Sequence, residues 1–147
     1  MDEDKIQARR REQDEEATRR RASILGLQYL DGREFEDTLP LLKDVLTIDE
    51  MYKGRLVPLA FNEEDQSYRF GVTSQTSESL MKRMRDQYVE NGKRIFFFLI
   101  SGSAFRSIML RFDPPKKVIY DNIEIAKEGD SDTLAQVTQT LASVGTN

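Results

Sequence analysis

The chain contains one Gly-Lys pair that could belong to a phosphate-binding loop, Gly92-Lys93. Such a loop needs an earlier glycine, so that backbone N–H groups surround the phosphate, and a Ser or Thr after the lysine to bind Mg²⁺. Gln87 stands at the position of the earlier glycine, and Arg94 at that of the Ser or Thr. The pattern G-x-G-x-x-G is missing as well. The sequence therefore predicts no nucleotide-binding loop.

Other residue types that carry out catalysis are absent or have a structural explanation. The chain has no cysteine and no histidine, which excludes thiolate nucleophiles, zinc sites of the Cys/His type and His-based triads. A serine could act with a lysine base, but no spacing supports such a pair. Carboxylates that could form acid–base pairs are Asp31 with Glu34, Asp49 with Glu50, and Glu63, Glu64 and Asp65. Helix capping explains the second set and a solvated turn the third, so we predict no catalytic, cofactor-binding or metal-binding residue and no enzyme activity in this chain.

Basic side chains are the remaining candidates, and they suggest a binding surface. Residues 53–117 hold twelve basic and seven acidic side chains, a net charge of +5 in a chain whose total charge is −4. Such a charge can steer a partner, although an ordinary solvated face has the same composition. The predicted partner-binding residues are Lys82, Arg83, Arg85, Arg106, Arg111, Lys116 and Lys117.

An alternative use of this region is nucleotide or nucleic-acid binding by the basic surface of residues 76–117. Phe96-Phe97-Phe98 could then stack on the bases of a single strand. The same phenylalanines also fit a buried strand, in which alternation would bury Phe96 and Phe98 and expose Phe97. We favour the buried strand, and with it a protein partner and no direct contact with nucleic acid.

The elements that position these residues begin with a charged helix. Residues 1–21 hold seven basic and seven acidic side chains, and a helix there would be polar all round, so it is either exposed or docked on another surface. Gly26 is the expected end of this helix. We divide the chain into a helical extension (1–21), an α+β domain (22–115) and a linker that starts the next unit (116–147), where residues 131–144 form a last helix.

The middle of the chain predicts a small mixed sheet with helices packed on it. Two strand-like runs, 55–61 and 67–73, form a hairpin whose first strand lies at an edge, since Pro58 cannot donate a hydrogen bond. A helix starting at Thr76 or Ser77, a buried strand over 94–101 and a second helix starting at Ser101 or Ser103 follow. Pro114-Pro115 ends that helix. The expected core residues are Val57, Leu59, Phe70, Val72, Leu80, Met84, Phe96, Phe98, Ile100, Phe105, Ile108 and Met109.

Two shorter features precede the hairpin. Thr47 and Glu50 have the spacing of a capping box, and Gly54 stands where a glycine commonly ends a helix. Pro40 suits the first turn of another short helix. The longest apolar run, residues 95–100, is too short to cross a bilayer, so we expect no transmembrane segment.

Several segments together resemble one family, the type II secretion and type IV pilus assembly ATPases. Residues 51–60, with Arg55-x-x-Pro58-Leu59, are similar to the point where a short helix of that family leads into a strand. Leu25-Gly26-Leu27-x-Tyr29-x-Asp31 resembles the entry into the same N-terminal domain, and residues 70–76 and 104–106 match its later strand and helix. Residues 72–76 and 111–116 look like the version found in candidate-phylum bacteria.

The resemblance, which covers about residues 22–113, implies the N-terminal domain of a motor. Whole proteins of this family are hexameric cytoplasmic ATPases at the inner membrane, and their ATP and Mg²⁺ bind in a motor domain absent from this sequence. The N-terminal domain docks on the cytoplasmic part of the membrane platform or on adaptor proteins. Some relatives bind cyclic-di-GMP through an Arg-Leu-Gly…Gln motif, but this chain has Ile24-Leu25-Gly26 and lacks the later spacing.

Overall fold

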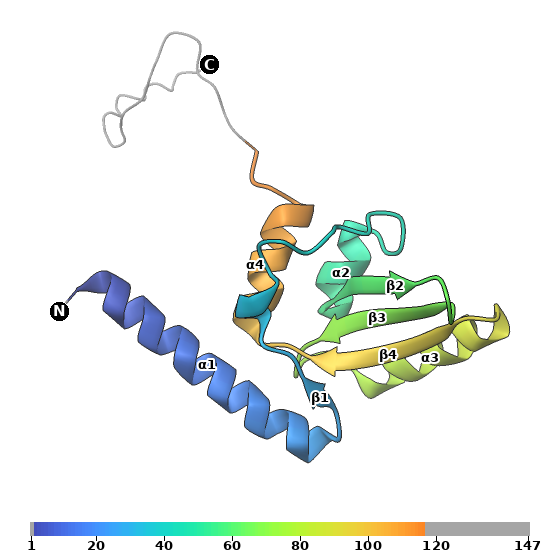
Figure 1. Cartoon of the computed structure of the whole chain (residues 1–147), viewed down its shortest axis with the longest axis horizontal. Coiled ribbons are helices and arrows are strands. Elements are labelled where there is room, and N and C mark those ends of the chain that lie inside the picture. The colour runs from blue at the N-terminus through green and yellow to red at the C-terminus, as the bar shows by residue number, and fades with distance from the viewer. Residues whose placement is uncertain (1, 117–147) are drawn as a thin grey trace, which may run out of the picture. The chain divides into compact units, whose positions relative to one another are not determined.

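The computed structural model describes residues 2–116, and residues 2–114 form one compact α+β unit (Figure 1). This confirms the predicted fold class. The helices are α1 (Glu3–Leu25), α2 (Ile48–Gly54), α3 (Glu78–Glu90) and α4 (Gly102–Phe112), with a short 3-10 helix η1 (Gly32–Glu34). The strands are β1 (Gln28–Tyr29), β2 (Leu56–Asn62), β3 (Ser67–Val72) and β4 (Arg94–Leu99). The helix predicted over residues 131–144 lies outside the described residues, as does Lys117.

The four strands form a mixed sheet in the order β1-β4-β3-β2. β2 and β3 are the predicted antiparallel hairpin, and β2 is an edge strand, as its proline requires. The register of the hairpin shifts between Pro58 and Ala60, so a bulge lies next to the residue that cannot donate. The helix α3 connects β3 to β4, and these two strands are parallel. β4 also pairs in parallel with β1.

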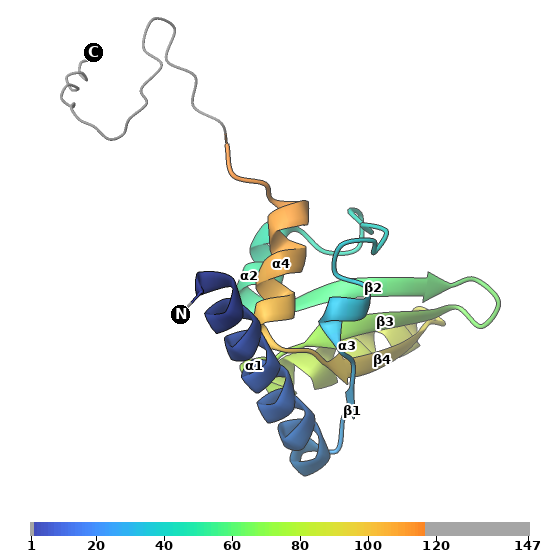
Figure 2. The same ribbon diagram turned by 60° about the vertical axis from the view of Figure 1, so that its left-hand side comes forward.

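The two faces of the sheet have different helical covers (Figure 2). On one face, α3 packs through Met84 against Phe70, Val72, Phe97 and other strand residues, which we call the α3-side core. On the other, α4 packs against Val57, Leu59 and Ile100, together with Met51 of α2; we call this the α4-side core. The predicted helix positions Phe105, Ile108 and Met109 are buried there, because they recur at helical spacing.

The predicted alternation along β4 is wrong by one residue. Phe97 is 7 % exposed, whereas Phe96 is 37 % exposed and Phe98 is only partly buried. The register places Phe97 opposite Phe70, so both side chains point toward α3, which lies along β4. Phe96 points to the other face, where the Arg94 guanidinium lies 5.3 Å from its ring. Leu80, another predicted core residue, is partly buried.

Helix α2 begins with the predicted capping box, in which Thr47 and Glu50 exchange two hydrogen bonds. Its end differs from the prediction, because Arg55, not Gly54, adopts the left-handed conformation, with φ of 58°. A Cβ at Gly54 would lie 2.4 Å from Leu56 Cδ2 and 2.8 Å from Leu80 Cδ2, so both leucine side chains would have to shift to accommodate it. No helix forms at Pro40. The residues before it form a turn, in which the Leu39 N–H donates a hydrogen bond to the Phe35 carbonyl.

Helix α1 begins at its cap residue Asp2 and ends at Gly26, which has the left-handed φ of 73° expected for a terminating glycine. The helix is continuous through residues 21 and 22, where the sequence had suggested a boundary. Its second half contacts the sheet and α4, and it buries Glu15, Thr18 and Ala22. The charged helix is therefore docked on the α+β body.

Candidate functional site

A buried carboxylate attaches α1 to the body. Glu15 has no exposed surface, and its oxygens accept hydrogen bonds from Arg11 Nε at 2.6 Å, Tyr29 OH at 2.5 Å and Ser101 Oγ at 2.6 Å. These donors come from α1 itself, β1 and the turn after β4. Because burial of an unpaired carboxylate is very costly, the three donors are what allow Glu15 to lie there.

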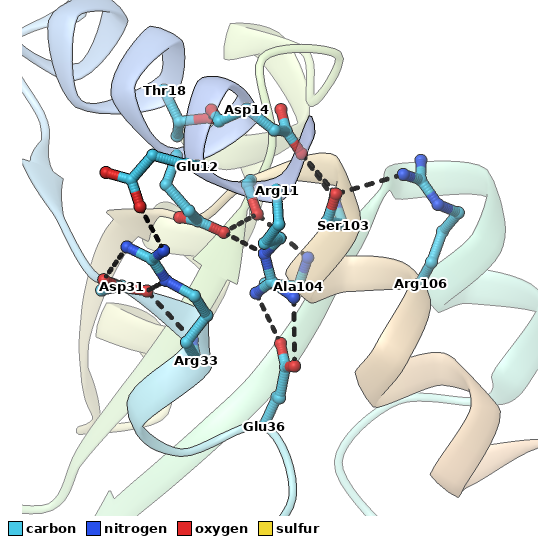
Figure 3. A network of polar contacts seen from close by, with 12 residues as sticks. Arg11, Glu12, Asp14, Thr18, Asp31, Arg33, Glu36, Ser103, Ala104 and Arg106 are labelled. Atoms are coloured by element: carbon cyan, nitrogen blue, oxygen red, sulfur yellow. Dashed lines mark hydrogen bonds and ion pairs between the residues drawn. The ribbon is translucent and has the colours of Figure 1, made fainter. Parts of the chain in front are cut away.

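A ring of ion pairs surrounds this contact (Figure 3). Arg11 also donates through two nitrogens to Glu36, at 2.7 and 3.1 Å. Arg33 donates to Asp31 and, at 2.8 Å, to Glu12 of α1. Both arginines thus join α1 to the segment that follows β1, and each has its charge matched by carboxylates.

The same contacts shift the pKa values of several of these groups. The hydrogen bond to Glu36 raises the pKa of Arg11, and the Arg33 guanidinium lowers the pKa of Asp31. Burial, followed by the hydrogen bond to Glu15, raises the pKa of Tyr29. In each case the shift favours the protonation state present at neutral pH.

Asp14 occupies the start of α4. Its carboxylate accepts hydrogen bonds from Ser103 N at 3.2 Å and Ser103 Oγ at 2.5 Å, while the cap residue Ser101 accepts from Ala104 N (Figure 3). A carboxylate is favoured there by the partial positive charge of a helix N-terminus. α1 thus supplies a second N-terminal cap for α4.

Beside Asp14 lies a pocket at the carboxyl ends of the parallel strands β3 and β4. Its volume is about 210 Å³. α1 forms one wall, α4 another, and the turn after β3 a third. The lining residues are Asp14, Thr18, Arg21, Arg55, Thr73, Ser74, Gln75, Leu99, Ile100, Gly102, Phe105 and Arg106. We call it the arginine pocket, after its three basic residues.

Two of these arginines have defined neighbours within the pocket wall. Arg55 Nε donates to Gln75 Oε1 at 2.9 Å, and its guanidinium lies 5.4 Å from the Phe105 ring centre. Arg106 donates to Ser103 Oγ at 3.3 Å. The Arg55 backbone is fixed as well, since its carbonyl accepts a hydrogen bond from the buried Thr76 hydroxyl. The arginine side chains are therefore held by neutral groups.

A larger groove lies between α2 and α3, next to the edge strand β2. Its volume is about 670 Å³. Its apolar lining includes Leu56, Leu80 and Met84, and its charged residues are Glu50, Lys53 and Arg83. Lys53 is paired with Asp49, and the Glu50 carboxylate accepts a hydrogen bond from Thr47 N, so Arg83 is the charged residue of this groove that forms no ion pair within residues 2–116. We call it the α2–α3 groove.

Of the seven residues predicted as one partner-binding surface, five lie on two separate helices, and Lys117 lies outside the described residues. Lys82, Arg83 and Arg85 belong to α3, on one side of the sheet, and Arg106 and Arg111 to α4, on the other. Lys82 pairs with Asp86, Arg85 lies over the Phe97 ring, and Arg111 donates to the Glu36 carbonyl. Lys116 is exposed at the end of the described chain. The structure brings Arg83 to the α2–α3 groove and Arg106 to the arginine pocket.

The carboxylates considered for acid–base chemistry do not converge. Asp31 is bound to Arg33, Asp49 pairs with the exposed Lys53, and residues 63–65 lie in the hairpin turn. Within residues 2–116, no group of three or more Asp or Glu side chains could hold a metal ion. Among the described helices, none has the length and apolar character needed to cross a membrane.

Sequence reasoning missed Glu15, Arg21 and Arg55. Glu15 and Arg21 lie in a charged segment where nothing distinguishes them from their neighbours, and Arg55 was treated as the start of a strand. The helical spacing of Asp14, Thr18 and Arg21 with the small residue Ala22 was the one available signal, since it marks a single face of α1.

No family model, curated protein or solved structure matches this chain.

Proposed function

We propose that this chain is a non-catalytic docking domain of a pilus-assembly or secretion motor. It joins the motor to the cytoplasmic part of the inner-membrane platform or to adaptor proteins. The chain itself then works in the cytoplasm, peripheral to the membrane through its partners, and ATP, Mg²⁺ and hexamer formation belong to the motor part of the parent protein.

The observation that carries the proposal is the α2–α3 groove. The partly buried apolar side chains of Val45, Leu46 and Leu80 lie beside Lys53 and Arg83 in this groove, next to the edge strand β2. An amphipathic helix binds such a surface by placing its apolar stripe in the groove. The positive charge favours a partner helix with acidic residues flanking that stripe.

The motif residues behind the family resemblance have definite structural roles, which supports the proposal indirectly. Gly26 ends α1, Tyr29 bonds to the buried Glu15, and Pro58 lies at the bulge of the edge strand. These are scaffold roles. They fit a domain that presents a rigid surface, and they give it no catalytic group.

The basic residues do not favour the nucleic-acid alternative. A single strand needs a continuous basic track with aromatic rings exposed for stacking. Here the α3 and α4 arginines lie on opposite sides of the sheet, and Phe97 is buried. Arg94 covers the most exposed phenylalanine of the three, Phe96.

A binding titration with the purified cytoplasmic domains of the platform and its adaptors tests the proposal. Arg83→Glu should weaken binding about fivefold or more, because the change replaces an attraction by a repulsion at the groove. Lys82→Glu is the matched control: it is the same charge reversal at the neighbouring residue, which does not line the groove. The proposal fails if no component binds at high micromolar concentration, or if both variants weaken binding equally.

A further inference from the structure

The arginine pocket carries an unbalanced charge. Three arginines and one aspartate line it, so its ionised side chains sum to +2. The single carboxylate, on Asp14, is committed to Ser103 through two hydrogen bonds. A ligand that balanced this charge would carry two negative charges.

The ion pairs of the described residues leave the charge of the pocket arginines unneutralised, as they do for most arginines of residues 2–116. Arg11 and Arg33 are each bound to two carboxylates. By contrast, Arg21, Arg55 and Arg106 form no ion pair within residues 2–116. Arg55 and Arg106 are oriented by Gln75, Phe105 and Ser103, which hold the guanidinium without neutralising it.

The position of the pocket in the sheet also favours a ligand. Ligands of open sheets with parallel strands bind at the carboxyl ends of those strands, where loops and helix N-termini meet. The pocket lies there, between the turn after β3 and the start of α4. Its residues come from α1, the α2–β2 junction, the β3–α3 turn and α4, so only the folded unit brings them together.

The size of the pocket limits what fits. Pockets for drug-sized molecules have volumes of about 300–1,000 Å³, and this one has about 210 Å³. It therefore suits one compact charged group, with any remainder of a ligand lying outside. Guanidinium groups bind phosphate oxygens through paired N–H donors, and each arginine has five such donors.

We propose that the arginine pocket binds a phosphate group, either as free phosphate or as the terminal group of a small phosphomonoester. Arg21, Arg55 and Arg106 are its ligating side chains, and the pocket charge of +2 matches the phosphate dianion. This site is independent of the α2–α3 groove, which involves neither Arg21 nor Arg106.

The test is a titration of sodium phosphate into the 147-residue chain at constant ionic strength. Calorimetry measures the affinity, and backbone amide NMR shifts locate the site. Phosphate should shift the amides of residues 73–75 and 102–106 and leave those of 82–85 in place. The double variant R21Q/R106Q should bind at least about tenfold more weakly, since each hydrogen bond to a charged group contributes enough for such a loss. R20Q/R83Q removes the same charge from positions that do not line the pocket, and it should bind like the wild type.

Two further ligands, AMP and acetate, separate the sources of the anion, and sodium chloride serves as the salt control. AMP binding more tightly than phosphate would show that the site takes a phosphomonoester, and equal or weaker binding of AMP would assign it to free phosphate; both support the proposal. Acetate binding as well as phosphate would overturn it in favour of a carboxylate, for instance on a partner protein. The proposal would also be overturned if R21Q/R106Q and R20Q/R83Q lost phosphate affinity equally, or if phosphate shifted the same amides as sodium chloride does. Either result would mean that phosphate acts only by general charge screening.

Discussion

Glu15 shows how a single charged residue can hold a polar helix on a protein. α1 has almost no apolar face, so hydrophobic burial contributes little to its docking. The carboxylate of Glu15 instead collects donors from three segments, one of them Ser101, 86 residues away in the chain. Because the three donors lie on different segments, they reach one carboxylate only when α1 is docked in a single orientation.

Replacing Glu15 by alanine should lower the free energy of unfolding by about 3–5 kcal/mol. The change leaves Tyr29 OH and Ser101 Oγ without their acceptor, and it removes the buried carboxylate that pairs with Arg11. Urea denaturation measures the change. Glu12→Ala on the same helix is the control: Glu12 is exposed and pairs only with Arg33, so its loss should stay within about 1 kcal/mol. Equal effects of the two substitutions would contradict this account of Glu15.

The hydroxyl of Tyr29 gives the contact a pH dependence. Because the pKa of Tyr29 is raised in the folded protein, the unfolded chain loses this proton first as the pH rises through about 10. The contribution of Tyr29 to the free energy of unfolding is thus fully present below pH 10 and is lost progressively at higher pH. Tyr29→Phe should be less stable than the wild type at pH 8, and the difference should shrink by pH 11. Urea titrations at both values test this, and a difference that stays constant would refute it.

At the scale of elements, β4 shows what its own sequence can and cannot determine. The run from Ile95 to Ile100 is apolar at every position, so it identifies a buried strand but not its phase. The phase depends on pairing with β3, which places Phe97 beside Phe70 and toward α3. Which face of β4 is buried against α3 is therefore set by residues distant in the sequence, through the crossover helix and the strand register.

The two phenylalanines make a direct test of this phase. Phe97→Ala should cost about 3–5 kcal/mol, since it leaves a cavity beneath α3. Phe96→Ala removes the same side chain from the more open face and should cost about 1 kcal/mol. Thermal or urea unfolding of both variants decides between the structure and the alternation that the sequence alone suggests, which reverses their order.

Strong local signals elsewhere did predict the elements. The capping box at Thr47, the edge proline Pro58 and the apolar spacing of α4 all correspond to features of the fold. Each depends on contacts within a few residues or on one periodicity. The arginine pocket could not be predicted in this way, since Arg21, Arg55 and Arg106 are separated by more than thirty residues and are united only by packing.

For the molecule as a whole, the main structural consequence is that α1 is part of the α+β unit. Its second half docks through Glu15, Thr18 and Ala22 and forms a wall of the arginine pocket, whereas residues 3–5 and 7–10 of its first half are exposed. A protease must unfold a helix locally before it can cleave it, so resistance reports local stability. The two halves of α1 should therefore differ, although both are rich in arginine.

Limited trypsin digestion followed by mass spectrometry makes this difference measurable. In the wild type, cleavage after Arg9 and Arg10 should precede cleavage after residues 19–21, because opening the second half breaks the contacts of Glu15 and exposes Ala22. In Glu15→Ala the two sets of sites should be cut at similar rates, while Glu12→Ala should keep the wild-type order. Early loss of all of residues 1–21 from the wild type would instead show an independent extension. The arginine pocket would then lose a wall, so the same digestion also tests whether the phosphate site exists in the intact chain.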